Sequence, residues 1–243
     1  MSTTSATGVI EWGRERLRAG PWRGDRTVAY LNPVPGTPLP SPDFLRRCLR
    51  TLSSQGYRRV VTGALAPAEQ APFRLVGFAP SEELHLLSHD LAGAAPAGAD
   101  PRFSLRRASR RDRPIVLALD AQAFEPFWQL DESGLDDAIA ATPHTRFRVA
   151  VTAGDPDDVV GYAITGRAGR RGYLQRLAVR PDHQGEGLGT LLVADALRWL
   201  RRWRGERAMV NTQLANERAL ALYERLGFRR EPAGLSVLTI DLP

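Results

Sequence analysis

The sequence contains no lysine, only one cysteine and no long apolar run, and each absence excludes something. With Cys48 as the single thiol, no intrachain disulfide can form, and no cysteine–histidine set has the spacing of zinc ligands, so we expect no metal site. No run of about eighteen apolar residues occurs, so no transmembrane helix and no membrane partner are expected. The polar segment Met1–Gly8 lacks the apolar core of a signal peptide. Together these absences favour a cytoplasmic protein.

All 33 basic residues are arginine, and with 27 acidic residues they give a net charge of +6. Arginine clusters of this kind can bind nucleic acid. Here they are spread along the chain and lack interleaved aromatic residues, which favours ordinary solvated surfaces. Nucleic-acid binding is therefore kept only as an alternative function.

The most informative stretch is Tyr173–Gly189, which predicts a strand, a glycine turn and a helix. Leu174, Leu177 and Val179 favour the strand, and the apolar spacing from Leu188 to Trp199 is that of a helix. Glycines in the turn allow positive φ and a close backbone approach. The unpaired N–H groups at a helix start attract anions, so the pattern predicts a phosphate cradle.

Two motifs carry a resemblance to a known family. Gln184-x-x-Gly187-x-Gly189 resembles the pyrophosphate motif of the GNAT acyltransferase superfamily, and Asn216 followed by Ala221-Leu-Tyr223-Glu-Arg-Leu-Gly227-Phe228 resembles its closing pattern. The resemblance implies an α/β fold with a mixed sheet, in the order β-α-α-β-β-β-α-β-α-β-β over residues 102–243. The last two strands, within Gly227–Leu242, are expected to form a hairpin.

The chain also contains an internal repeat at an offset of 150 residues. Val60 aligns with Val210, and Gly77-Phe78 aligns with Gly227-Phe228, but Phe73 stands where the later copy has Tyr223. We therefore expect residues 1–91 to form a truncated, degenerate GNAT-like half without active-site residues. A small-residue linker follows at 92–101, and the acetyltransferase domain at 102–243.

The resemblance implies acetyl-CoA as co-substrate and assigns residues to it. Leu177, Ala178 and Val179 would offer a strand edge to the pantetheine, Asn216 would bond the same arm, and Tyr223 would protonate the leaving thiolate. A backbone N–H near Leu177 would hold the developing oxyanion. The pyrophosphate cradle would be formed by Gln184, Gly185, Glu186, Gly187, Leu188, Gly189 and Thr190.

The general base is less clearly indicated, because the predicted strand offers Gln175 and Arg176 in place of a carboxylate. An alkyl ammonium with a pKa of about 10.4 must lose a proton before it attacks. A water held by Gln175 is one candidate; the carboxylates between the first two helices of the domain are others, and Asp131 is favoured over Glu125 and Glu132. The same segment is expected to form an acceptor wall from Phe124, Glu125, Phe127 and Trp128.

The sequence thus predicts an N-acetyltransferase that moves acetyl from acetyl-CoA to a primary amine, in a small metabolite or a protein, by direct attack in a ternary complex. A monomer or homodimer is expected. The missing strand carboxylate keeps a non-catalytic acyl-CoA-binding regulatory module open as an alternative.

Overall fold

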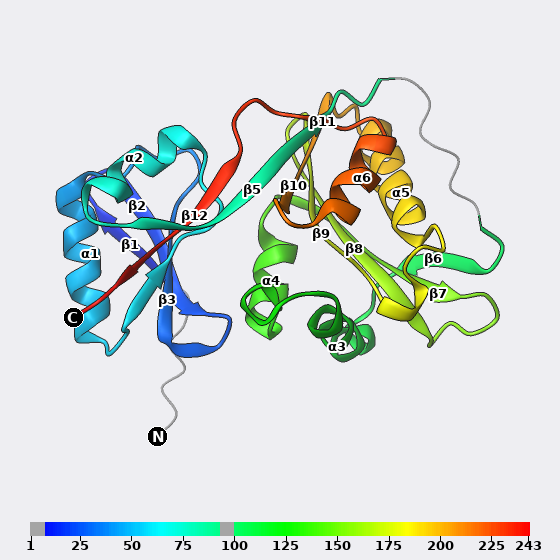
Figure 1. Cartoon of the computed structure of the whole chain (residues 1–243), viewed down its shortest axis with the longest axis horizontal. Helices are drawn as coiled ribbons and strands as arrows, with labels where there is room; N and C mark the ends of the chain where they lie inside the picture. Colours follow the sequence, from blue (N-terminus) through cyan, green and yellow to red (C-terminus); the bar gives the residue numbers. More distant parts are fainter. Residues whose placement is uncertain (1–7, 93–99) are drawn as a thin grey trace. The chain divides into compact units, whose positions relative to one another are not determined.

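The computed structural model describes residues 8–92 and 100–243, and the chain divides into two units that are not contiguous in sequence (Figure 1). The first unit contains the chain up to Leu86 together with Gln213–Ala215 and Pro232–Pro243. The second contains Leu87–Thr212 and Asn216–Glu231. Most of the expected linker, residues 93–99, lies outside the described residues. Among the described residues, none of the helices combines the length and apolarity needed to cross a bilayer.

The first unit is built on a sheet with helix α1 (Pro42–Ser54) and helix α2 (Pro67–Leu75). Its strands, in sheet order, are β1 (Gly8–Trp12), β2 (Glu15–Trp22), β3 (Asp25–Pro33), β4 (Arg59–Val61), β12 (Leu235–Asp241) and β5 (Ala79–His89). Helix α1 begins with Ser41 as its N-cap and Pro42 as its first residue, a common helix start. Sequence patterns did not indicate β1 and β2, whose charged and exposed residues leave little apolar alternation.

The second unit has helices on both faces of its sheet (Figure 1). The strands, in sheet order, are β10 (Arg207–Gln213), β9 (Arg171–Val179), β8 (Val159–Ala168), β7 (His144–Thr152) and β6 (Phe103–Arg107). The apolar core on one face contains α5 (Leu188–Arg202) and α6 (Glu217–Arg225). The core on the other face contains α3 (Arg113–Ala123) and α4 (Glu132–Ala140). Short 3-10 turns lie at Arg110–Asp112, Pro126–Trp128 and Pro181–His183.

The expected terminal hairpin at 227–242 is wrong, because the last two strands of the chain pair in different units. Strand β11 (Arg229–Arg230) pairs with the end of β5 within the second unit, whereas β12 pairs with β4 and β5 within the first. Leu238 of β12 is fully buried in the first unit's core. The two units consequently do not coincide with the expected segments 1–91 and 102–243.

Candidate active site

Strands β9 and β10 separate at the place where the sequence predicts the co-substrate. Their parallel pairing ends at Tyr173 with Met209, although β9 continues to Val179. The backbone from Leu174 onward therefore lacks a β10 partner on that side. Leu177, Ala178 and Val179 fall in this unpaired length of β9, as the resemblance implies.

A bulge in β9 turns two consecutive side chains toward α3 and α4. In the ladder with β8, Arg176 pairs with Ile164 but Leu174 pairs with Thr165, so Gln175 is the extra residue. Gln175 Nε2 donates to Thr142 Oγ1 at 3.3 Å, while its Oε1 is buried and has no hydrogen-bond partner among the described residues. An unused acceptor therefore lies at the mouth of the separated strands.

The glycine turn leaves the start of α5 open. Gly187 is the N-cap at φ 87° and offers no side chain to the first N–H groups. Gly185 has φ 89°, and a Cβ built at either glycine would meet no atom within 4 Å. Gly189 instead lies against α6, where a Cβ would come 2.9 Å from Leu222 Cδ2. The N–H groups from Gly185 to Thr190 are thus presented together, which fits an anionic diphosphate.

Side chains of the turn bond away from this opening. Gln184 Nε2 donates to the Val179 carbonyl at 3.2 Å, and its Oε1 accepts from Arg218. Glu186 lies 3.3 Å from His183 Nδ1 and 3.6 Å from Arg102 Nη1. The cradle is consequently made of backbone rather than of side chains.

Tyr223 and Asn216 both lie on α6, within the second unit. Asn216 is the helix N-cap, and its Oδ1 accepts from the Ala219 N–H at 3.0 Å. Tyr223 is 6% exposed, and its ring centroid lies 5.6 Å from that of Phe228. Burial raises the pKa of the Tyr223 phenol, and the positive charge of Arg176 acts in the opposite direction. The phenol therefore keeps its proton at neutral pH, and its raised pKa makes it a weaker proton donor than a free tyrosine.

The predicted acceptor segment lies between α3 and α4. The guanidinium of Arg176 stacks on Phe124, with its carbon 3.5 Å from the ring centroid, and Phe127 meets Trp128 edge-on at 5.1 Å. Glu125 is exposed. Asp131 caps α4, with Oδ1 accepting from the Gly134 N–H at 2.7 Å. The carboxylate favoured as general base therefore already stabilises a helix start.

A buried ion pair that the sequence reasoning missed fixes this segment to β9. Asp120 is fully buried in α3 and accepts two hydrogen bonds of 2.8 Å from Arg176. The same carboxylate accepts from the Tyr162 hydroxyl and from the Leu130 N–H, and Arg176 also donates to the Trp128 carbonyl at 2.7 Å. The available signal was the single acid of the apolar helix α3 and an arginine within the apolar part of β9. Removing one member of such a pair typically costs about 3–5 kcal/mol.

This fold and site belong to a known class. Residues 114–228 match the family described as acetyltransferase (GNAT) family. A tandem GNAT protein from the clavulanic acid biosynthesis pathway has a similar fold, with a TM-score of 0.66 and 15% identity over 93% of this chain and 78% of that one. A GCN5-related N-acetyltransferase from Kribbella flavida gives a TM-score of 0.62 and 16% identity over 98% and 90% of the two chains.

The most informative relative in sequence is a mycothiol acetyltransferase from Salinispora tropica. It is 31% identical over 236 residues, covering 88% of this chain and 77% of the relative. The chain belongs to the GNAT acetyltransferase family and is an N-acyltransferase. The predicted class, fold and N-acetyltransferase activity are thus confirmed. GNAT acetyltransferases use acetyl-CoA as co-substrate.

Proposed function

We propose that the second unit binds acetyl-CoA along the unpaired length of β9 and transfers its acetyl group directly to a primary amine. The observation that carries the proposal is the continuity of two features. The separation of β9 from β10 begins at Tyr173, and β9 leads into the uncapped start of α5. We assign no active site to the residues of the first unit.

The chain's own backbone would hold the co-substrate. N–H groups from Gly185 to Thr190 would bind the diphosphate, whereas the Gln184 N–H already donates to the Pro181 carbonyl at 3.3 Å. The open space at Gly185 and Gly187 supports such a close approach. Leu177–Val179 would hydrogen-bond the pantetheine arm with the strand edge that β10 leaves unpaired. Asn216 would cap α6 and bind the same arm. When bound, acetyl-CoA supplies an activated thioester carbonyl.

Two groups would manage the protons. Tyr223 would give its phenolic proton to the departing sulfur, and the nearby positive charge of Arg176, which lowers the pKa of the phenol, favours that transfer. Gln175 would hold a water that removes a proton from the amine, which is supported by the unpartnered Oε1 atom at the bulge. Asp131 is the weaker candidate, because its carboxylate caps α4. A backbone N–H near Leu177 would stabilise the charge that develops on the acetyl oxygen.

The acceptor is proposed to be a small amine of the mycothiol type, by similarity to the Salinispora tropica enzyme. Phe124, Phe127 and Trp128 would form its wall. The Asp120–Arg176 pair would hold that wall in place, through the stacking on Phe124 and the bond to the Trp128 carbonyl. A buried clamp of this kind suits a compact acceptor, since it keeps the site's shape fixed.

The test is thiol release from acetyl-CoA in the presence of three classes of acceptor: mycothiol-type amines, polyamines and peptide N-termini. Mycothiol-type amines are expected to give the highest kcat/KM. A preference for peptides would overturn the metabolite assignment. Tight acetyl-CoA binding without release by any amine would overturn the enzymatic proposal in favour of a regulatory module.

A further inference from the structure

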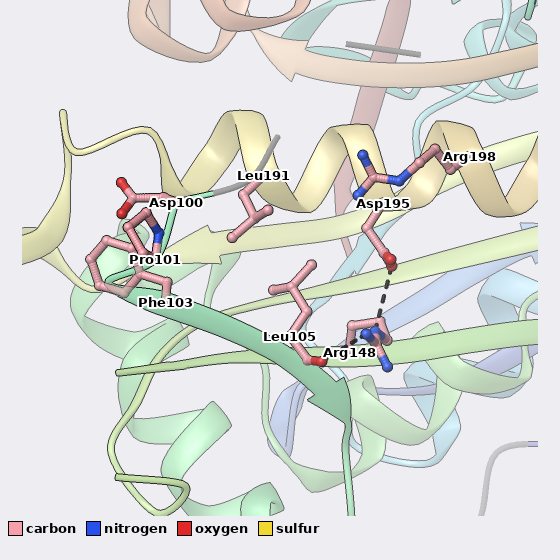
Figure 2. A pocket seen from close by; sticks show the side chains of 8 residues that line it. All are labelled: Asp100, Pro101, Phe103, Leu105, Arg148, Leu191, Asp195 and Arg198. Atoms are coloured by element: carbon pink, nitrogen blue, oxygen red, sulfur yellow. Dashed lines mark hydrogen bonds and ion pairs between the residues drawn. The ribbon is translucent and has the colours of Figure 1, made fainter. Parts of the chain in front are cut away.

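A pocket in the second unit lies between α5 and the strands β6 and β7 (Figure 2). Its apolar walls are Phe103, Leu105 and Leu191, and its polar lining includes Arg148 and Arg198. Strand β8 separates β7 from β9, so this pocket and the proposed co-substrate site lie over different parts of the sheet. Neither the proposed reaction nor the cradle uses these residues.

The lining of this pocket holds two carboxylates, Asp100 and Asp195, beside Arg148 and Arg198, but the ion pairs at one end are uneven. Asp195 bonds Arg146 through both carboxylate oxygens at 3.0 Å. Arg148 Nε lies 3.5 Å from the same carboxylate and makes no hydrogen bond within the described part of the chain. Its Nη2 donates to the Leu105 carbonyl at 2.9 Å. Arg146 and Arg148 thus share the Asp195 carboxylate, and Arg198 also lines the pocket.

Of the two cations that share Asp195, Arg148 is the less compensated. Its side chain is only 19% exposed, yet its one acidic neighbour is already fully bonded by Arg146. Burial lowers the pKa of Arg148 more than the nearby Asp195 raises it. A desolvated guanidinium with an unused donor is best satisfied by a carboxylate, which accepts its fork of N–H groups.

We propose that this pocket binds a small amphipathic anion, a carboxylate carried on a short apolar chain or ring. The carboxylate would meet Arg148 and Arg198, and the apolar part would lie against Phe103, Leu105 and Leu191. This combination of an apolar wall with a few convergent polar groups is typical of small-molecule sites.

The pocket is connected to the turn that precedes α5. The ring of Phe103 lies edge-on to His183 at 5.8 Å. Arg102 bonds Asp100 at 2.9 Å and lies 3.6 Å from Glu186. An anion packed on Phe103 therefore stabilises the wall against which the turn rests, and it tightens acetyl-CoA binding. This coupling rests on the proposed function of the cradle, whereas the anion site itself does not.

The experiment uses hexanoate as the probe, measured by calorimetry on the full chain. One hexanoate is expected to bind per chain, and hexylamine and hexanol are expected to bind at least tenfold more weakly. Arg148→Gln should weaken hexanoate binding at least tenfold. Arg107→Gln, an exposed arginine on β6, is the control and should leave it unchanged.

A second variant and a measurement with acetyl-CoA present test the site independently of Arg148→Gln. Arg198→Glu reverses a charge on the exposed side of α5 and should also weaken binding at least tenfold, even if Arg148→Gln fails to fold. Saturating acetyl-CoA should tighten hexanoate binding about threefold or more, since coupling between two sites is reciprocal. Hexanoate binding that both variants retain, or that acetyl-CoA abolishes, would overturn the site. Arginine-dependent hexanoate binding in a chain that does not bind acetyl-CoA would instead refute only the proposed cradle and the coupling.

Discussion

The two units differ at the N-terminus of the helix that follows a parallel strand, which is α1 in the first unit and α5 in the second. Strands β3 and β9 each have nine residues, and α1 and α5 each begin nine residues after the strand ends. The start of α1 is closed by Ser41, whose N–H and hydroxyl donate to the Glu15 carboxylate at 2.5 and 3.1 Å and whose Oγ accepts from Phe44. The start of α5 has only Gly187. In the first unit the Glu15 carboxylate lies at the helix start, whereas in the second unit the helix start is open to an external anion.

The two units also differ in how far each of these strands pairs with its parallel neighbour, β3 with β4 and β9 with β10. Tyr30, the sixth residue of β3, still pairs with Val61, and Asn32 Oδ1 accepts from the Gly63 N–H just beyond it. In the second unit the pairing ends at Tyr173, the third residue of β9. Similar local folds can thus open or close a cleft through a few side chains at the strand end and the helix cap.

The largest predicted effect is a loss of stability, and it tests the packing of β12 in the core of the first unit. Leu238→Ala should lower the free energy of unfolding by about 2–5 kcal/mol, because it opens a cavity in the first unit's core. Cys48 is buried in the same core, so its reaction rate with a thiol reagent reports the loss. Leu214→Ala, at a leucine that is 45% exposed, is the control. Unchanged Cys48 protection in the Leu238 variant would mean that β12 does not stabilise the first unit.

Gly187→Val should weaken acetyl-CoA binding at least about 100-fold, or roughly 2.7 kcal/mol. Valine disfavours the positive φ of 87°, and its side chain enters the open space in front of the N–H groups. Gly36→Val is a matched control, since Gly36 has φ +81° and equally open surroundings in the loop before α1. Calorimetry should find normal acetyl-CoA binding there. Equal losses in both variants would indicate general strain and not a cradle.

Tyr223→Phe should lower kcat about 100-fold, the scale of a general acid, and leave the Kd of acetyl-CoA within about twofold. The aligned residue in the first half, Phe73, has no hydroxyl. Tyr57→Phe, at a buried tyrosine of the first unit, is the control and should leave kcat unchanged. A Tyr223 variant with full activity would reduce this side chain to core packing.

Glu15→Gln should destabilise the first unit by about 1 kcal/mol, the usual scale for removing a charge from a helix start. The amide retains one acceptor for the Ser41 donors, which limits the loss. Urea unfolding measures it, with Glu11→Gln as control because Glu11 is exposed. A loss of the same size in the Glu11 variant would show that the position of the charge at α1 is unimportant.

The smallest effect concerns pH. Burial raises the pKa of Cys48 from 9.0 to about 12. Above pH 9 the unfolded thiol releases its proton while the folded thiol keeps it, so folding stability falls as pH rises, by about 0.8 kcal/mol at pH 9.5. Comparing urea unfolding of the wild type and Cys48→Ala from pH 8 to 10 isolates this contribution. Parallel stability–pH curves would show that the thiol is not protected from solvent.

Much of the site could be predicted because its signals are local. The glycines before α5, Asn216 at the start of α6 and Tyr223 within it have fixed spacings, and a helix start presents N–H groups whatever surrounds it. The Asp120–Arg176 pair was missed because its partners are 56 residues apart and meet only through packing of α3 on β9. The helix cap made by Asp131 was also missed, because its carboxylate was interpreted as a general base.

By itself, the sequence determined the class of enzyme, the repeat and the glycine turn, because motifs and periodicity act over a few neighbouring residues. Tertiary structure alone decided that β11 pairs in the second unit and β12 in the first, because the strands that they pair with lie far away in the sequence. It also decided that the first helix start is closed and the second open, because the deciding carboxylate, Glu15, lies 26 residues from the cap it occupies.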